Sequence, residues 1–178
     1  MRLTYSWWVQ GKPFNGNVAR KAPQIWGCKV PLKVRFFMWL AYNDRLLTRA
    51  YRSIWRPGDP TSCALCGDDL ETTQHLFCGC AFAREVWLNL GSSLGGGWCP
   101  SDLNHLWELG SRLSRRNDRS LRSKILQSLV PAIMWAIWIG RNDKIFWGTL
   151  VSVEGVWEGA KRNIGVGLPL CRGFPGSS

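Results

Sequence analysis

Three cysteines and one histidine in a short stretch are the residues of this chain best suited to chemistry. Their spacing is Cys-x2-Cys-x8-His-x4-Cys, formed by Cys63, Cys66, His75 and Cys80. Three thiolates and one imidazole complete the tetrahedral shell that Zn²⁺ adopts in structural sites, with no position open for a substrate or a reactive water. The spacing therefore predicts one structural zinc ion rather than a hydrolytic metal centre.

The spacing alone leaves the fourth ligand open. Cys78 lies two residues before Cys80 and would give an x2 spacing after His75. Gly67, directly after the first cysteine pair, supplies the backbone freedom that the tight turn of such a site uses. We expect the remaining cysteines to be ordinary thiols: Cys28, Cys99 and Cys171.

Helices must hold these ligands in place. Apolar residues at helical spacing predict a helix over residues 33–42. Its stripe is Val34, Phe37, Met38 and Ala41, widened by Phe36, Trp39 and Leu40. Thr48 is a candidate cap for a second helix that reaches residue 55, and a third helix is expected to begin at Thr72 or Thr73.

We expect a mainly α fold, in which a small zinc-knuckle domain over residues 20–90 is followed by a helical extension over 101–162. The glycine-rich residues 91–100 predict a flexible linker between them. Residues 1–19 and 163–178 are expected to be a loose entry segment and a disordered tail. Within the extension, residues 102–113 and 121–146 are predicted to be helical. The longer helix is apolar nearly all round, so it must be buried against this chain or a partner.

The charge of the chain favours anionic partners. Its 178 residues carry 23 Lys and Arg against 12 Asp and Glu, a formal net charge of +11. Such a balance is typical of proteins that bind nucleic acid, although a basic solvated surface gives the same count. The candidate phosphate contacts are Lys33, Arg35, Arg45, Arg49, Arg52, Arg115, Arg116 and Arg119. The 12 tryptophans are expected to lie mostly in the core, while any exposed one could stack on unpaired bases.

The sequence favours an intracellular protein, in the nucleus or the cytoplasm. No apolar signal segment follows Met1, and seven cysteines with metal-ligand spacing suit a reducing compartment. The longest apolar run, residues 129–139, contains Pro131 and is too short to cross a bilayer. We therefore expect no membrane partner.

Two segments resemble a known family. The first runs from Trp26 through Pro31-Leu-Lys-Val-Arg-Phe-Phe-Met-Trp39, the Cys63 and Cys66 pair and Glu71-Thr72 to His75-Leu-Phe77, Cys80 and Trp87. It resembles the zinc-binding domain of plant non-LTR (LINE-type) retrotransposon reverse transcriptases. That family's pattern selects Cys80, rather than Cys78, as the fourth ligand.

The second segment, Trp135-Ala-Ile-Trp138-Ile-Gly-Arg141-Asn142 with Phe146, is similar to a helix that follows this module in the same polyproteins. The resemblance implies docking to a reverse transcriptase or ribonuclease H domain absent from this chain. No carboxylate set suits two-metal nucleolysis, and no nucleophile–base pair is evident. We therefore do not expect an enzyme.

Three hypotheses remain open from the sequence. The leading one is a non-catalytic zinc module of retrotransposon origin that contacts RNA or single-stranded DNA through basic and aromatic surface. The second is a structural or protein-interaction module that docks to a polymerase or ribonuclease H domain. The third is a decayed fragment that folds poorly and has no function.

Overall fold

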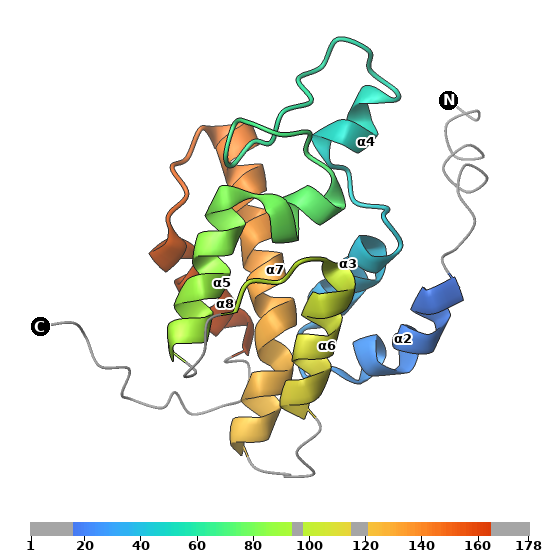
Figure 1. Cartoon of the computed structure of the whole chain (residues 1–178), viewed down its shortest axis with the longest axis vertical. Helices are drawn as coiled ribbons and strands as arrows, with labels where there is room; N and C mark the ends of the chain where they lie inside the picture. Colours follow the sequence, from blue (N-terminus) through green and yellow to red (C-terminus); the bar gives the residue numbers. More distant parts are fainter. Residues whose placement is uncertain (1–15, 94–97, 115–120, 165–178) are drawn as a thin grey trace, which may run out of the picture.

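The structure, a computed structural model, describes residues 16–93, 98–114 and 121–164 as helices joined by loops (Figure 1). The helices are α2 (Gly16–Gly27), α3 (Leu32–Tyr42), α4 (Arg49–Ser53), the π-helical turn η1 (His75–Gly79), α5 (Ala81–Ser93), α6 (Leu103–Ser114), α7 (Leu121–Trp147) and α8 (Val153–Ile164). In these described ranges there is no strand, only an isolated antiparallel bridge between Ser62 and Leu70. The prediction of a mainly α fold is confirmed.

Side-chain and proline caps fix where several helices begin. Pro31 occupies the position before α3, where its missing N–H costs nothing. The Thr48 hydroxyl accepts a hydrogen bond of 3.3 Å from the Tyr51 N–H at the start of α4. The Asp102 carboxylate accepts one of 2.8 Å from the His105 N–H at the start of α6. These polar groups satisfy N–H donors that a helix start leaves without intrahelical partners.

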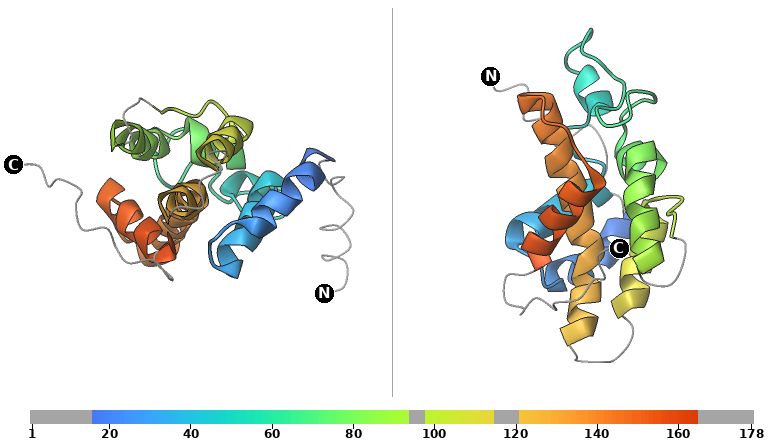
Figure 2. Two further views of the ribbon diagram at one scale, coloured as in Figure 1. Left: turned by 90° about the horizontal axis from the view of Figure 1, so that it is seen from below. Right: turned by 90° about the vertical axis from the view of Figure 1, so that its left-hand side faces the viewer.

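Helix α7 lies at the centre of the molecule. It packs against α6, α8 and α3, and Figures 1 and 2 show these helices on different sides of it. Ala132, Ile133, Met134 and Ile137 in its middle are fully buried. The long apolar helix expected from the sequence therefore finds its neighbours within this chain. None of the helices in the described ranges combines the length and apolarity needed to cross a membrane.

One hydrophobic core joins the two halves of the chain. The ring of Phe37 on α3 meets Phe77 edge-on at 5.9 Å between centroids and Trp135 of α7 at 5.3 Å. The same buried cluster extends from Ile25 to Ile164. The expected division into residues 20–90 and 101–162 stays a prediction, and the structure adds that both ranges contribute to a common core.

Some local expectations were wrong. Phe36 does not widen the buried stripe of α3, because the helical turn directs it to the surface, where 51% of it is exposed. Helix α5 continues to Ser93, so the first residues of the expected linker are helical. Helix α8 ends at Ile164, inside the expected tail. Residues 1–15, 94–97, 115–120 and 165–178 lie outside the described part of the chain.

Candidate metal centre

A tight turn presents the first two cysteines. The N–H of Gly67 donates to the carbonyl of Cys63 at 2.8 Å, and Gly67 has a φ of +87°, a conformation that favours glycine. The Cys63 N–H donates to the carbonyl of Asp69 at 2.7 Å, beside the Ser62–Leu70 bridge. This short loop, closed by the bridge, orients both thiols toward η1.

The π-helical turn η1 presents the other two ligands. The Thr72 hydroxyl accepts a hydrogen bond of 3.0 Å from the His75 N–H, so Thr72 caps the turn, at one of the two starting positions expected from the sequence. The Cys80 N–H then donates to the carbonyl of His75 at 2.7 Å, which closes a turn wider than that of an α-helix. His75 and Cys80 are thereby brought to the same side.

The four predicted ligands come together. The Sγ atoms of Cys63, Cys66 and Cys80 and a ring nitrogen of His75 all lie within 4.8 Å of one another. Tetrahedral zinc would place two sulfurs about 3.8 Å apart and a sulfur and a nitrogen about 3.6 Å apart. The Cys63 and Cys80 sulfurs are 3.9 Å apart, and Cys66 Sγ is 3.4 Å from His75 Nε2. The donor set and its dimensions fit a closed zinc shell.

The alternative ligand, Cys78, is not part of this group. It lies on η1 but its side chain is buried in the hydrophobic core. Burial raises the pKa of the Cys78 thiol to about 12, because a thiolate would be poorly solvated there. The geometry thus brings Cys80, and not Cys78, to the other three ligands.

The two buried thiols of the centre are electrostatically coupled. The hydrogen bond from Cys63 to Cys80 raises the pKa of Cys63, and burial raises it further. The same hydrogen bond lowers the pKa of Cys80, because it stabilises the thiolate that accepts it. Since the thiolate is the metal-binding form, a cation that takes both sulfurs must displace the proton of Cys63.

A carboxylate lies behind the histidine ligand. Asp69 Oδ2 is 3.6 Å from His75 Nδ1, the ring nitrogen that faces away from Cys66. A carboxylate on that side favours a proton on Nδ1 and leaves the lone pair of Nε2 for a metal ion. Gly79 packs closely against the same ring, since a Cβ there would come within 3.2 Å of His75 Nδ1.

Replacing Asp69 by alanine is therefore expected to weaken zinc binding about tenfold. This is the smallest loss typical of residues that orient a metal-binding histidine, and we expect it because Asp69 is 78% exposed. Competition titration with a chromophoric chelator measures this affinity. Asp68→Ala is the matched control, because Asp68 carries the same charge and is the neighbour of Asp69 in the same loop, whereas the ion pair with His75 is made by Asp69. Equal losses in both variants would mean that only the negative charge of the loop matters.

Glu71 ties the metal loop to the rest of the fold, a role the sequence did not reveal. Its side chain is fully buried, and Oε2 accepts a hydrogen bond of 2.9 Å from the N–H of Ala64, between the two cysteines. Its Oε1 accepts one of 2.8 Å from the N–H of Arg49 at the start of α4. One carboxylate thus fixes both the cysteine turn and a helix start.

The charge of Glu71 is balanced by Arg141 of α7. Arg141 is 2% exposed, and its Nη2 and Nε donate to Glu71 Oε1 at 2.5 and 3.1 Å. Its guanidinium lies 4.9 Å from the centre of the Trp138 ring, and Nη2 also reaches the carbonyl of Leu47. Both residues stand within the quoted family strings, but nothing in those strings indicates that they pair across 70 positions.

A second contact joins α7 to the metal loop. The ammonium of Lys144, one turn beyond Arg141, donates to the carbonyl of Leu65 at 3.1 Å, in the middle of the cysteine pair. The C-terminal part of α7 therefore braces the site from outside the segment that contains the ligands.

The predicted basic residues have different surroundings. Arg45 is buried, with 6% exposed, and so does not belong to the surface candidates. Arg35 donates to the carbonyls of Val30 and Trp26, and Arg49 to that of Ser62. Arg52 pairs with Asp59 at 3.1 Å. Lys33 is exposed, with its ammonium 5.7 Å from the centre of the Trp135 ring.

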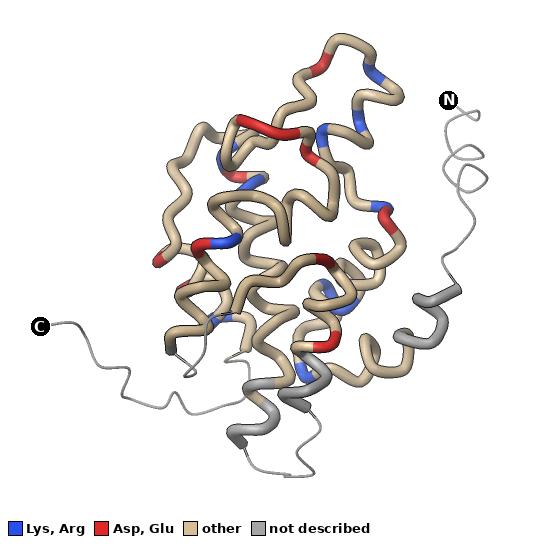
Figure 3. The backbone as a smooth tube through the Cα atoms, in the orientation of Figure 1, with Lys and Arg blue, Asp and Glu red and all other residues tan. Residues whose placement is uncertain are grey.

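Cations gather along α4 and the loop after it, and they recur on α3 (Figure 3). The candidates Arg115, Arg116 and Arg119 lie outside the described residues. The nucleic-acid contacts named from the sequence therefore stay predictions.

Comparison with known families agrees with this centre. Residues 3–87 match the model of a family described as zinc-binding in reverse transcriptase. The matched range contains all four ligands and Glu71, whereas Arg141 lies beyond it. No curated protein and no solved structure gives a significant match. The family match and the Cys3His group both fit a zinc-binding module.

Proposed function

We propose that this protein is a non-catalytic module of retrotransposon origin that holds one structural Zn²⁺ and binds RNA or single-stranded DNA. The convergence of Cys63, Cys66, His75 and Cys80 within 4.8 Å is the observation that carries the zinc assignment. Four protein ligands leave zinc no open coordination position, so the ion stabilises the fold rather than activating water.

The nucleic-acid part of the proposal is supported by charge and by aromatic surface. The formal net charge is +11, and Trp26, Phe36 and Trp55 are among the exposed large side chains. Cations attract phosphates whatever the sequence, and exposed rings stack on unpaired bases. A protein that combines both on its surface is suited to single strands.

Binding to single strands is expected to weaken steeply with salt. Fluorescence anisotropy of the zinc-loaded protein with labelled U20 or dT20, between 50 and 200 mM KCl, measures the effect. If about four phosphates are neutralised, the affinity should fall about 50-fold over this range. The physical reason is that Lys and Arg side chains that bind phosphates release counterions condensed on the strand. A higher salt concentration makes this release less favourable and so weakens binding.

The control is a methylphosphonate oligomer of the same sequence, which keeps the bases and lacks the backbone charge. It should bind much more weakly than U20 or dT20 at low salt. An affinity for the charged strands that does not change with salt would refute phosphate recognition.

A second candidate function is docking to a reverse transcriptase or ribonuclease H domain. It is favoured by Phe146, Trp147 and Leu150, which are large, apolar and exposed at and beyond the end of α7. Exposed apolar residues that stand together mark interaction surfaces more often than single ones do. Sedimentation of the same samples separates the two functions, because self-association without nucleic-acid binding would favour docking.

A further inference from the structure

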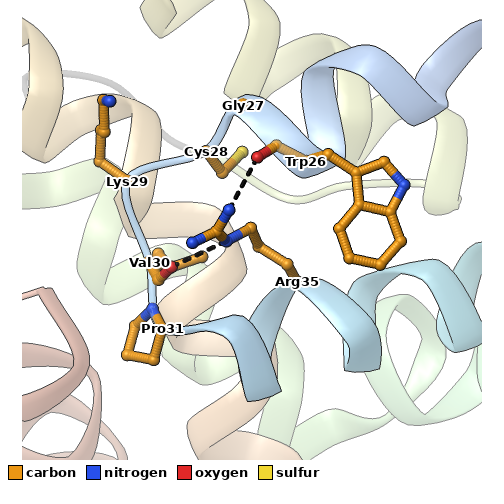
Figure 4. Close-up of a pocket in the computed structure, with 7 residues that line it drawn as sticks. All are labelled: Trp26, Gly27, Cys28, Lys29, Val30, Pro31 and Arg35. Atoms are coloured by element: carbon orange, nitrogen blue, oxygen red, sulfur yellow. Dashed lines mark hydrogen bonds between the residues drawn. The ribbon is translucent and has the colours of Figure 1, made fainter.

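A pocket of about 350 Å³ lies at the turn between α2 and α3 (Figure 4). It is lined by Trp26, Gly27, Cys28, Lys29, Val30, Pro31 and Arg35. Lys29 is exposed, and 40% of the Trp26 surface is exposed. The lining combines two cations with one large aromatic ring and contains no carboxylate.

The cationic centre of the pocket is held in a fixed position. Arg35 Nε donates to the carbonyl of Val30 at 3.1 Å, and Nη1 donates to that of Trp26 at 2.9 Å. A guanidinium has five N–H groups, so these bonds leave three for a ligand. Figure 4 shows the guanidinium inside the turn, whereas the Lys29 side chain and the Trp26 ring lie outside it, on opposite sides. A cation held in this way loses little conformational freedom when it binds a phosphate.

The exposed face of α3 beside the pocket also combines a cation with aromatic rings. Leu32, Arg35, Phe36 and Trp39 follow one another at helical spacing on α3, opposite its buried stripe. The rings of Phe36 and Trp39 are stacked, with centroids 6.0 Å apart and planes inclined by 22°. No Asp or Glu precedes Asp44 in the sequence, so no carboxylate of this segment offsets the cations.

We propose that this pocket is the place where a single-stranded nucleic acid is anchored, with a phosphate at the Arg35 guanidinium, attracted also by the charge of Lys29, and a base against Trp26. The inference rests on the proposed function and makes it specific to one site. A single strand fits better than a duplex, because the ring of Trp26 can stack only on a base that has left its pair. The Phe36–Trp39 pair offers a stacking surface for a neighbouring base.

Two variants test the pocket on the zinc-loaded full chain, with anisotropy of labelled U20 and dT20 in parallel titrations that also separate RNA from DNA. Trp26→Leu keeps an apolar side chain and removes the stacking face, so affinity should fall about tenfold. Lys29→Ala removes an exposed charge, so the salt slope of log affinity should fall in magnitude by about 0.7. Arg35 stays unchanged because it holds the turn together.

The matched control is the pair Trp147→Leu and Arg84→Ala, which removes one exposed ring at the end of α7 and one exposed cation on α5, neither of which lines the pocket. These changes should leave affinity within twofold of the wild type. Circular dichroism must show equal helical signal in all proteins. If the wild type binds and the Trp26 and Lys29 variants bind equally well, the pocket is refuted and the proposed function stands. If the wild type binds neither strand at any salt concentration, both are refuted.

Discussion

Cys80→Ser should abolish stoichiometric zinc binding and lower the thermal stability of the protein. Zinc binding to structural sites provides about 10–16 kcal/mol in small zinc modules, and this free energy becomes folding free energy when the ligands are brought together only in the folded state. The cysteine turn and the His75 turn are joined to each other by one bridge and a few hydrogen bonds, and the Glu71–Arg141 pair joins them to α7, so an ion that links all four side chains adds a large share of their mutual attachment. Metal analysis of the purified protein and thermal unfolding followed by circular dichroism measure both effects.

Cys78→Ala is the matched control for this experiment. Cys78 lies on the same turn, but its sulfur is buried in the hydrophobic core and not in the ligand group. The variant should keep one zinc ion per chain and lose only the modest stability of a small core truncation. Loss of zinc in Cys78→Ala with retention in Cys80→Ser would show that the fourth ligand has been assigned wrongly.

Arg141→Met should destabilise the protein by about 3–5 kcal/mol. The substitution keeps much of the volume of the side chain but leaves the fully buried carboxylate of Glu71 without a positive partner. An uncompensated buried charge is much more costly than the loss of the pair itself. Urea unfolding of the zinc-loaded protein measures the change.

Two further variants distinguish charge pairing from general damage to α7. Lys144→Met removes a cation one turn further along the helix, whose ammonium donates an exposed hydrogen bond to the carbonyl of Leu65, and should cost about 1 kcal/mol or less. Glu71→Gln combined with Arg141→Met removes both charges and should recover part of the loss. A cost for Arg141→Met as small as that for Lys144→Met would mean that the ion pair does not secure the metal loop.

Three of the candidate ligands were predictable from sequence because metal coordination imposes spacing rules on neighbouring residues, whereas spacing did not choose between Cys78 and Cys80. Cys63 and Cys66 must share a turn, and His75 and Cys80 must follow closely enough to complete one shell. The caps Thr48, Thr72 and Asp102 were predictable for a similar reason, because a cap acts on the first turn of its own helix. All of these interactions are local.

Spacing rules could not predict which side chains are buried by residues distant in the sequence, or which distant groups they contact. Helical spacing placed Phe37 in the buried stripe, where α7 and η1 cover it, but it also added Phe36, which the structure leaves exposed. Likewise, Arg35, Arg45 and Arg49 resemble one another as surface cations in the sequence. The fold uses Arg35 and Arg49 to hold backbone carbonyls and buries Arg45.

The sequence by itself determined the candidate ligands Cys63, Cys66 and His75, the helical class and the apolar character of α7, because each depends on residues a few positions apart. Only the tertiary structure decided that α7 is buried within this chain and that Arg141 neutralises Glu71 behind the cysteine turn. The physical reason is that a buried charge requires an opposite charge close to it in the folded structure, wherever that charge lies in the sequence. Any cation that the fold brought to Glu71 would have satisfied it, so no local pattern could identify Arg141.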